Sequence, residues 1–405
     1  MSENRFDVAV VGAGPVGLAA ALAMARIGCR TCLVGPEPER PDGRTAALLA
    51  GSVELLLALG VWAALAPDAG ALRTLRIVDA TDSLFRPPSV AFRADEIGLD
   101  AFGWNIENAR LAEALASASR QQAGVVWIPE LVERLEVTEA ARLTMAGGST
   151  VDASLVIAAD GRRSRVRTES GIRAEGRRYP QTAFTTIIGH ERPHGDVSTE
   201  FHTRAGPFTL VPLPGNRSSL VWVTVPRHAE RLRAVDDEIL AEVIETASRS
   251  ILGRVTIEGP RGAVPLVALM ADRLTAPRVA LAGEAAHVLP PIGAQGLNLG
   301  FGDVAALARI VADARRAGLD PGSEQVLSRY GRDRSSAIRL RSIAVDGLNR
   351  ALLSSFPLVD AARGLGLGLL GQIGPLRRAV MRAGLPQGGR GHISPGTGAA
   401  GSSPS

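Results

Sequence analysis

The sequence contains no lysine, so all 45 of its basic residues are arginines. Because arginine keeps its proton up to high pH, the pI is about 9.9 although the net charge is only +4. The arginines form no run interleaved with aromatic side chains, and aromatics make up only 4% of the chain. A nucleic-acid-binding surface is therefore not expected.

Cysteine is nearly absent. The two cysteines, Cys29 and Cys32, have the CxxC spacing of a redox pair. They lie in or next to an expected buried strand at 30–34, where residues three apart face opposite sides. We therefore expect two core thiols, which suit a reducing, cytosolic compartment. The six histidines show no zinc-type spacing with these cysteines, so no metal site is expected.

Long apolar runs are also scarce. One run, from Val8 to Ala25, follows Arg5 and is long enough for a signal peptide or a membrane span. Glycines and a proline interrupt it in an order that has another explanation, and no other uncharged run reaches a spanning length. At 405 residues and 46% hydrophobic content, the chain is expected to be globular, with two domains that can be interleaved.

The interrupting residues form a G-x-G-x-x-G motif made of Gly12, Gly14 and Gly17. An apolar strand at 6–11 precedes the motif, and an Ala/Leu-rich helix from Leu18 to Gly28 follows it. In this setting the first glycine permits a tight turn, the second lets a pyrophosphate approach, and the third lets helix and strand pack closely. The motif predicts a dinucleotide site at the helix N-terminus.

The next strand, at 31–34, ends at Gly35, where a dinucleotide fold usually has an acid for the adenosine ribose. Either Glu37 reaches back to the ribose or that contact is absent. Arg44 begins an expected amphipathic helix that runs to Leu59. Its side chain faces a cleft or forms a solvated helix start. Asn108 and Arg110, in the first turn of an expected helix at 107–121, are candidates for the same cleft.

An Asp-Gly pair, Asp160-Gly161, follows a buried strand at 154–159 and precedes a run of arginines. Open α/β sheets place ligand contacts at such carboxyl ends of strands, although the arginine run also suits a plain solvated turn. From Arg278 to Asp303 the chain reads RVALAGEAAHVLPPIGAQGLNLGFGD: a short strand, an acid, a histidine, two prolines and a glycine-rich loop. A helix expected from about Gly296 would present free backbone N–H groups to a ligand.

Together these three segments resemble the flavin monooxygenases of the p-hydroxybenzoate hydroxylase type. Within that group the chain is most similar to the ubiquinone-biosynthesis hydroxylases, through DGRTAALLAGSVELLLALGVW at 42–62, WNIENARLAEAL at 104–115 and the region around Asp346. The resemblance implies FAD, with NAD(P)H and dioxygen as co-substrates. It implies hydroxylation of the ring of a polyprenyl phenol through a flavin C4a-hydroperoxide.

The resemblance also implies roles for single residues. Glu284, where the wider family most often has Asp, is expected to accept hydrogen bonds from flavin hydroxyls. Pro291 is expected near the flavin face where oxygen reacts. His287 is a candidate acid–base group, with a structural hydrogen bond as the alternative. The backbone N–H groups of Gly296, Leu297 and Asn298, at the start of the helix, are expected to stabilise negative charge on the reduced ring. Gly293, in the loop before that helix, is also expected to bind the cofactor.

The expected fold class is α/β, with a Rossmann-like FAD-binding domain of the glutathione-reductase type interleaved with a β-rich substrate domain and followed by C-terminal helices. Segments between about 182 and 267 alternate apolar and polar residues, as strands of an antiparallel sheet do. We therefore expect this part of the chain to form the substrate domain. The predicted boundaries are 1–72, 100–180 and 270–340 for the FAD-binding domain, 73–99 and 181–269 for the substrate domain, 341–386 for the C-terminal helices and 387–405 for a disordered tail.

Two alternative functions stay open: another aromatic hydroxylase or flavin oxidoreductase of the same fold, and a non-catalytic accessory subunit of a quinone-synthesis complex. The expected partners are a polyprenyl phenol and such a complex. A cytoplasmic protein with peripheral contact to the inner membrane is expected, because the substrate is insoluble and the segment 358–384 is rich in Leu and Gly. The alternative for that segment is a packed pair of helices.

Overall fold

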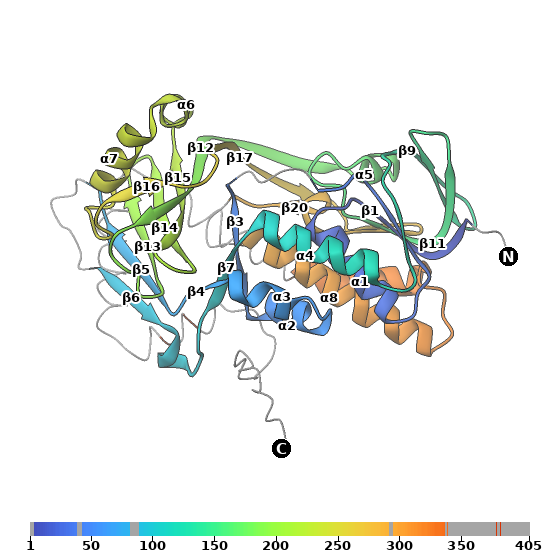
Figure 1. Cartoon of the computed structure of the whole chain (residues 1–405). Helices are drawn as coiled ribbons and strands as arrows, with labels where there is room; N and C mark the ends of the chain where they lie inside the picture. The colour runs from blue at the N-terminus through green and yellow to red at the C-terminus, as the bar shows by residue number, and fades with distance from the viewer. Residues whose placement is uncertain are drawn as a thin grey trace, which may run out of the picture.

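The structure is a computed structural model that describes residues 4–38, 43–81, 89–290 and 295–336, together with Ile338, Arg378 and Met381. Within this part, the chain forms an eight-stranded sheet, a nine-stranded sheet and a small three-stranded sheet. Figure 1 shows the two large sheets at opposite ends of the molecule, joined by the long strands β12 and β17. The site described below depends on how these two ends meet.

The first sheet has a parallel centre. Strand β1 lies between β2 and β11, with β8 and β19 outside them, and all of these pairings are parallel. Val8, Ala9 and Val10 have no exposed surface, as expected for a parallel strand covered on both faces. The strands are β1 (Arg5–Val11), β2 (Thr31–Val34), β8 (Val125–Ile128), β9 (Val132–Val137), β10 (Ala141–Met145), β11 (Thr150–Ala158), β18 (Thr275–Ala276) and β19 (Val279–Leu281).

Helix α1 is built largely of alanine, and its small side chains let neighbouring elements come close. A Cβ at Gly300 of α8 would lie 2.7 Å from a methyl of Val16, and a Cβ at Gly283 would lie 3.1 Å from it. The helices are α1 (Pro15–Arg26), α2 (Ala50–Ala58), α3 (Trp62–Leu65), α4 (Asn108–Gln121), α5 (Arg165–Glu169), α6 (Pro226–Ala234), α7 (Asp237–Ala247) and α8 (Gln295–Arg316), with 3-10 turns η1 (Ala66–Asp68), η2 (Ala94–Ile97) and η3 (Gly283–Ala285). Residues 324–336 are also helical.

In the described ranges, no single helix has the length and apolar character needed to cross a membrane. The bent pair Ala50–Ala58 and Trp62–Asp68 meets that requirement only when its two parts are taken together.

The second sheet is antiparallel except where β13 pairs with β5. Helices α6 and α7 cover one face of this sheet, where their apolar side chains pack on Phe184, Phe208 and Trp222. In Figure 1 these helices lie at the outer side of the sheet. The strands are β5 (Thr74–Asp79), β6 (Val90–Arg93), β12 (Ala174–His190), β13 (Val197–Thr203), β14 (Gly206–Leu213), β15 (Arg217–Thr224), β16 (Val255–Ile257), β17 (Gly262–Ala271) and β20 (His287–Val288).

A small sheet of β3 (Thr45–Leu49), β7 (Gly103–Glu107) and β4 (Gly70–Ala71) lies between the two large ones. The expectation of one helix from Arg44 to Leu59 is therefore wrong in its first part, because only Ala50–Ala58 is helical. Strand β3 forms because β7, more than fifty positions later in the chain, pairs with it in antiparallel register. A helical pattern in one segment gives no sign of such a distant partner.

The predicted α/β fold class is confirmed. The predicted domain boundaries stay a prediction, and two strands do not follow them. Strand β12 runs unbroken through the boundary at 180, and β20, from within 270–340, pairs with β17 of the second sheet. The C-terminal region lies outside the described residues except for Arg378 and Met381, which are helical, and Met381 is buried against Phe102. The predicted tail at 387–405 lies outside them entirely.

The two thiols provide a test of the fold. Burial raises the pKa of Cys29 to about 11 and that of Cys32 to about 12, and both are free thiols. At pH 8 roughly a thousandth or less of either thiol is then ionised. We expect a disulfide-exchange reagent to leave both thiols unmodified in the folded protein and to modify both in denaturant. Rapid labelling of the folded protein, or an intramolecular disulfide under mild oxidation, would restore the redox-pair interpretation.

Candidate functional site

A cavity of about 440 Å³ lies at the carboxyl ends of β1, β2 and β11. It brings together residues that the sequence predicts as a site from three separate segments: Gly12, Gly14, Glu37, Asp160 and Gly161. The other lining residues are Val11, Ala13, Val34, Gly35, Pro36, Pro38, Glu130, Leu131, Val132, Ala159, Arg163 and Arg165. Ligands of open parallel sheets bind at this edge.

The three glycines of the motif differ in how closely other atoms surround them. Gly12 has φ of +107°, and a Cβ there would lie 2.3 Å from the carbonyl oxygen of Ala159. A Cβ at Gly17 would lie 1.8 Å from the carbonyl oxygen of Gly12. Gly14 is different, because a Cβ there would meet nothing within 4 Å. Gly12 and Gly17 are thus required by the protein's own packing, whereas Gly14 leaves space open toward the cavity.

Asp160 adds an unsatisfied polar atom to the cavity. Its Oδ2 accepts a hydrogen bond from the N–H of Val166 at 3.2 Å, while its Oδ1 is buried with no partner in the described part of the chain. Burial is the largest influence on the pKa of Asp160 and raises it, while hydrogen bonds from Ser164 and from the backbone lower it. Buried polar atoms are normally hydrogen-bonded, so the free oxygen fits a ligand or an ordered water.

Gly35 stands where an acid was expected, and the structure gives the reason. Its φ is +154°, and a Cβ there would lie 2.9 Å from the backbone nitrogen of Ala13. The end of β2 therefore passes too close to the glycine loop for any side chain. Glu37 lines the cavity two residues later, and its carboxylate forms an exposed ion pair with Arg120 at 2.7 Å. An exposed pair of this kind is weak and leaves Glu37 available to a ribose.

The remaining basic and amide candidates do not line this cavity. The Arg110 guanidinium binds Asp68 of η1 at 2.8 Å and Glu113 of α4 at 2.5 Å. Arg44 is exposed, and its carbonyl oxygen accepts a hydrogen bond from the N–H of Asn108 at 3.0 Å. These two residues thus lie together where β3 and α4 begin. The roles in cofactor binding that the sequence predicts for Arg44, Asn108 and Arg110 stay predictions.

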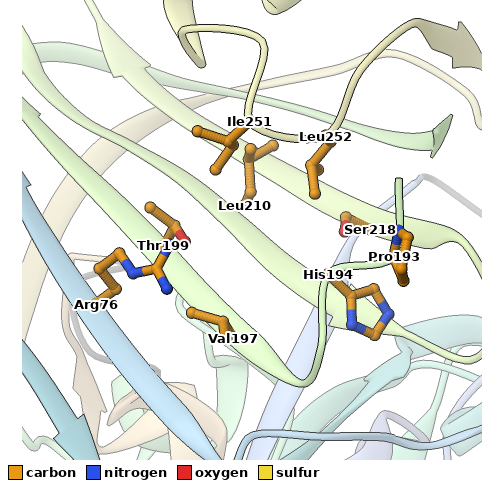
Figure 2. Close-up of a pocket in the computed structure, with 9 residues that line it drawn as sticks. All are labelled: Arg76, Pro193, His194, Val197, Thr199, Leu210, Ser218, Ile251 and Leu252. Carbon is orange, nitrogen blue, oxygen red and sulfur yellow. The ribbon is translucent and has the colours of Figure 1, made fainter. Parts of the chain in front are cut away.

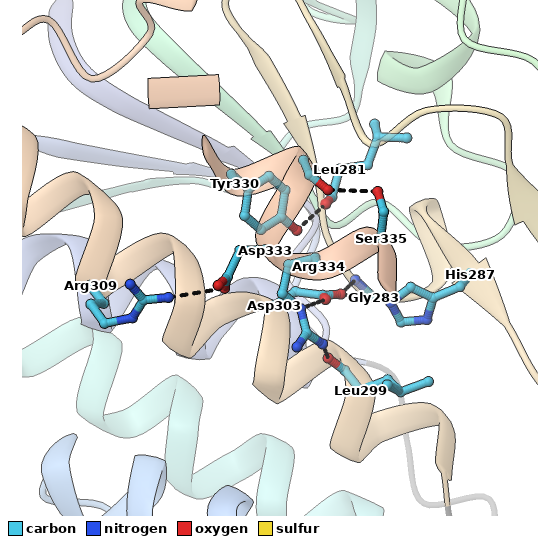
Figure 3. A network of polar contacts seen from close by, with 11 residues as sticks. Leu281, Gly283, His287, Leu299, Asp303, Arg309, Tyr330, Asp333, Arg334 and Ser335 are labelled. Atoms are coloured by element: carbon cyan, nitrogen blue, oxygen red, sulfur yellow. Dashed lines mark hydrogen bonds and ion pairs between the residues drawn. The ribbon is translucent and has the colours of Figure 1, made fainter. Parts of the chain in front are cut away.

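A buried ion network fixes the segment that carries Glu284 (Figure 3). Asp303, in α8, accepts hydrogen bonds from His287 Nε2 at 2.7 Å, from the Gly283 N–H at 3.0 Å and from Arg334 Nε at 2.8 Å. The Tyr330 hydroxyl donates to the carbonyl oxygen of Leu281 at 2.7 Å. Burial alone would raise the pKa of Asp303, but His287 and Arg334 outweigh it and lower the pKa. The network therefore holds an ionised carboxylate in the core.

His287 is itself fully buried, with Nε2 engaged by Asp303 and Nδ1 without a partner in the described residues. This geometry favours the structural hydrogen bond over the acid–base role, which nothing in the structure tests directly. Glu284, by contrast, is exposed in η3, and its carboxylate makes no hydrogen bond or ion pair with the described residues. Glu284 is therefore free to bind a ligand.

At the start of α8, some residues are open to a ligand, whereas the Asn298 side chain is already bonded within the protein. Gly296 is exposed, and a Cβ there would meet nothing within 4 Å, while Leu297 is half-buried. The Asn298 side chain is buried: it donates to the carbonyl oxygen of Ala47 at 2.7 Å and accepts from the N–H of Leu49 at 2.8 Å. It thus ties α8 to β3, while backbone N–H groups of the first helical turn remain for a ligand. Pro291 and Gly293 lie outside the described residues.

The arginine run after Asp160 has a role that the sequence did not separate from a solvated turn. Arg167 is buried, and its guanidinium donates to the carbonyl oxygens of Ala285 at 2.8 Å and Arg162 at 2.9 Å. It therefore connects the Asp-Gly segment to η3. Arg163 and Arg165 line the cavity and can supply positive charge to a pyrophosphate. The only signal in the sequence was their position directly after the Asp-Gly pair.

A second, smaller cavity of about 190 Å³ lies on the face of the second sheet that α6 and α7 cover, between its strands and the adjoining loops (Figure 2). Its lining includes Leu210 and Leu252, which belong to the core that α6 and α7 cover. The His194 ring donates through Nε2 to the carbonyl oxygen of Leu213 at 2.9 Å and accepts from the Asp196 N–H at 3.0 Å, so both ring nitrogens are occupied. The sheet itself separates this cavity from β3 and β7.

Comparison with known proteins agrees with this geometry. The model of a family described as FAD binding domain matches residues 5–340. Ubiquinone hydroxylase UbiL of Rhodospirillum rubrum is 35% identical over 389 residues, covering 94% of this chain and 90% of the relative. The 3-demethoxyubiquinol 3-hydroxylase of Escherichia coli is 32% identical over 391 residues, covering 94% of this chain and 99% of the relative.

Among solved structures, p-nitrophenol 4-monooxygenase PnpA from Pseudomonas putida has a TM-score of 0.76 at 19% identity, covering 94% of this chain and 98% of that one. Klebsiella pneumoniae HpxO, complexed with FAD and uric acid, has a TM-score of 0.73 at 20% identity, with the same coverage of 94% and 98%. At these identities the likeness concerns the fold. From the sequence relatives and the matched family model, the chain belongs to the FAD-dependent hydroxylase family of ubiquinone biosynthesis.

Proposed function

We propose that this flavin-dependent monooxygenase hydroxylates the aromatic ring of a polyprenyl phenol during ubiquinone biosynthesis. The reaction consumes NAD(P)H, a proton and dioxygen; one oxygen atom enters a ring C–H bond as hydroxyl, and the other leaves as water. The proposal rests chiefly on the pairing of β20 with β17. This pairing makes the segment directly after Glu284 an edge strand of the second sheet, so a cofactor held by that segment faces the sheet.

The residues of the first cavity fit FAD. The backbone of Gly12, Gly14 and Gly17 and the N-terminus of α1 would hold the pyrophosphate, with Arg163 and Arg165 beside it. Glu284 would accept hydrogen bonds from hydroxyl groups of the cofactor. The first turn of α8 would place N–H donors where negative charge develops on the reduced ring. When bound, FAD supplies the reductive activation of dioxygen.

The second sheet offers an apolar surface for the substrate. Val221, Val223, Ala183 and Leu266 form a cluster, with Tyr179 and Ala268 also packed in it. These residues lie on the face opposite α6 and α7, the same face as Ser219, which accepts a hydrogen bond from Thr45 Oγ1 of β3 at 2.8 Å. A prenyl-substituted ring buries most of its area against such a wall, at roughly 25 cal/mol per Å².

We further infer that the protein works as a peripheral protein at the cytoplasmic side of the inner membrane, within an assembly of quinone-synthesis enzymes. The support is chemical, because a polyprenyl phenol is insoluble in water and resides in the bilayer. The Leu- and Gly-rich segment 358–384 is the candidate contact, and it lies outside the described residues apart from Arg378 and Met381.

The oxygen-transfer step is tested with labelled dioxygen. The purified protein is supplied with FAD, NAD(P)H, ¹⁸O₂ and a short-chain polyprenyl phenol, and the product is analysed by mass spectrometry. We expect one ¹⁸O atom in the ring hydroxyl of the product. Oxidation of NAD(P)H without label in any phenol would instead support a flavin oxidoreductase. A preparation that stays colourless after FAD is added would support an accessory subunit.

Gly14→Ala tests the cofactor site separately from the fold. The φ of −74° and ψ of 174° at Gly14 suit alanine, and its methyl would meet no protein atom within 4 Å. We expect the free energy of unfolding of the FAD-free protein to stay within about 1 kcal/mol of the wild type. We expect FAD affinity to fall at least about tenfold, because the methyl occupies space next to the pyrophosphate.

Gly331→Ala is the matched control, since a Cβ there would lie 3.8 Å from Thr275 Oγ1 in ordinary contact. Flavin fluorescence titration gives the affinity, and thermal unfolding without FAD gives the stability. Wild-type affinity in Gly14→Ala would mean that the pyrophosphate does not lie against this loop.

A further inference from the structure

We propose that Glu200 and His202 of β13 form the site that binds the phenol hydroxyl, with the Glu200 carboxylate as the contact and His202 as the residue that positions it. This inference rests on the proposed function, since it names the group that orients the substrate. Glu200 and His202 belong neither to the motifs found in the sequence nor to the lining of the cofactor cavity. Three features support the inference: the face of the sheet, the unfilled hydrogen-bonding capacity and the chemistry of the pair.

The first feature is the face on which the pair lies. Residues that are paired in register across a sheet point to the same side. Glu200 is in register with Thr209 of β14, which is in register with Val221 of β15. His202 is in register with Pro207, the residue before Phe208, which pairs with Trp222. Side chains alternate along a strand, so the pair lies opposite the Phe208–Trp222 core under α6 and α7.

The same face meets the cofactor half of the molecule. Ser219, two residues before Val221, accepts hydrogen bonds from Thr45 at 2.8 Å and from Asn105 Nδ2 at 3.2 Å. Thr45 begins β3, the strand to which Asn298 ties the start of α8. Glu200 and Thr209 therefore continue, along the sheet, the surface that the flavin segment and β3 face. The apolar cluster around Val221 lies directly beside them.

The second feature is unfilled hydrogen-bonding capacity. Within the described residues, four of the buried side-chain atoms without a partner belong to strands of the second sheet: His287 Nδ1 of β20, His202 Nδ1 of β13, and Thr185 Oγ1 and Gln181 Oε1 of β12. Thr185 is in register with Val221, in the same row as Glu200, and is 6% exposed. His202 is 7% exposed. Because folded proteins satisfy nearly all buried polar atoms, the unpartnered Nδ1 of His202, next to Glu200, marks a place for a polar ligand.

The pair itself is well defined. His202 Nε2 and Glu200 Oε1 are 2.7 Å apart, and since a carboxylate only accepts, Nε2 is the donor. The other oxygen, Oε2, has only a long contact of 3.4 Å from Thr209 Oγ1. The Glu200 side chain is 26% exposed and the His202 side chain 8% exposed. The carboxylate is thus the accessible end of the pair, and the imidazole holds it from behind.

The third feature is the chemistry. A phenol hydroxyl donates to Oε2, which holds the ring through its oxygen while the prenyl group lies on the apolar cluster around Val221. When the electron-rich ring forms its bond to the transferred oxygen, the phenol proton passes to Oε2. The Nε2–H of His202 stays hydrogen-bonded to Oε1. Among the described residues, Arg249 donates to the carbonyl oxygen of Asp79 at 3.2 Å, and Asp79 of β5 is itself in register with His202. Its Oδ1 is occupied by the N–H and hydroxyl of Thr81 at 2.8 and 2.6 Å.

The test uses a probe that binds without turnover: a prenylated 4-nitrophenol added to the FAD-loaded protein without NAD(P)H. The phenol and phenolate forms of this probe differ in visible absorption, so difference spectra report both its affinity and its ionisation. Next to an anionic carboxylate, the neutral phenol is favoured over the phenolate. We expect the bound probe to ionise at a higher pH than the free probe, and Glu200→Gln to remove this shift and weaken binding at least about tenfold.

Three controls separate positioning from folding. Glu175→Gln, at an exposed position of β12, should leave the probe unaffected. His202→Gln keeps an N–H donor for Glu200 and should retain most of the shift, whereas His202→Leu should lose it. Bound FAD, measured by absorbance, should stay at the wild-type level in every variant.

The inference is overturned if the wild-type protein does not bind the probe, or if Glu200→Gln binds it with unchanged affinity and ionisation, as a merely water-filled pocket would. These outcomes are independent of the labelled-oxygen assay. A protein that hydroxylates the phenol but shows no role for Glu200 would keep the proposed function and remove this site.

Discussion

The carboxylate of Asp303 is the interaction on which the site depends. It lies in the core with no exposed surface, and it binds a backbone N–H at Gly283, the ring of His287 and the guanidinium of Arg334. Removing one partner of a buried ion network leaves an uncompensated charge, which costs several kcal/mol. By holding both ends of the segment 283–287 against α8, Asp303 sets where Glu284 points and where β20 joins the second sheet.

That junction explains why the two halves of the molecule act together. Strands β12 and β17 pass from one half to the other, and β20 adds the flavin segment to the edge of the second sheet. Thr45 of β3 closes the contact on the other side through Ser219. A cofactor held by the first sheet therefore faces a surface that is apolar on β15 and polar on β13, as a phenol with a prenyl chain requires.

Features that depend on local backbone geometry could be predicted from the sequence. Features that depend on contacts between distant segments could not. Gly12 and Gly17 were predictable because each allows a contact within a few residues or with an adjacent strand. Strand β3 was expected to be helical, because its spacing of alanines and leucines suits a helix and only pairing with β7 makes it a strand. The Glu200–His202 pair lies in an ordinary alternating strand, and only the register of β13, β14 and β15 shows which face it shares with the cofactor. No motif carries that information.

If the two halves act together in this way, the cofactor ring and the inner face of the second sheet enclose the substrate between them. The most direct measurement is a crystal structure of the protein with FAD and a prenylated phenol. We expect the pyrophosphate against Gly14, the flavin ring at the start of α8 and the phenol ring between that flavin and β15. A phenol bound in the cavity beside His194, or a flavin ring turned away from the second sheet, would be incompatible with this arrangement.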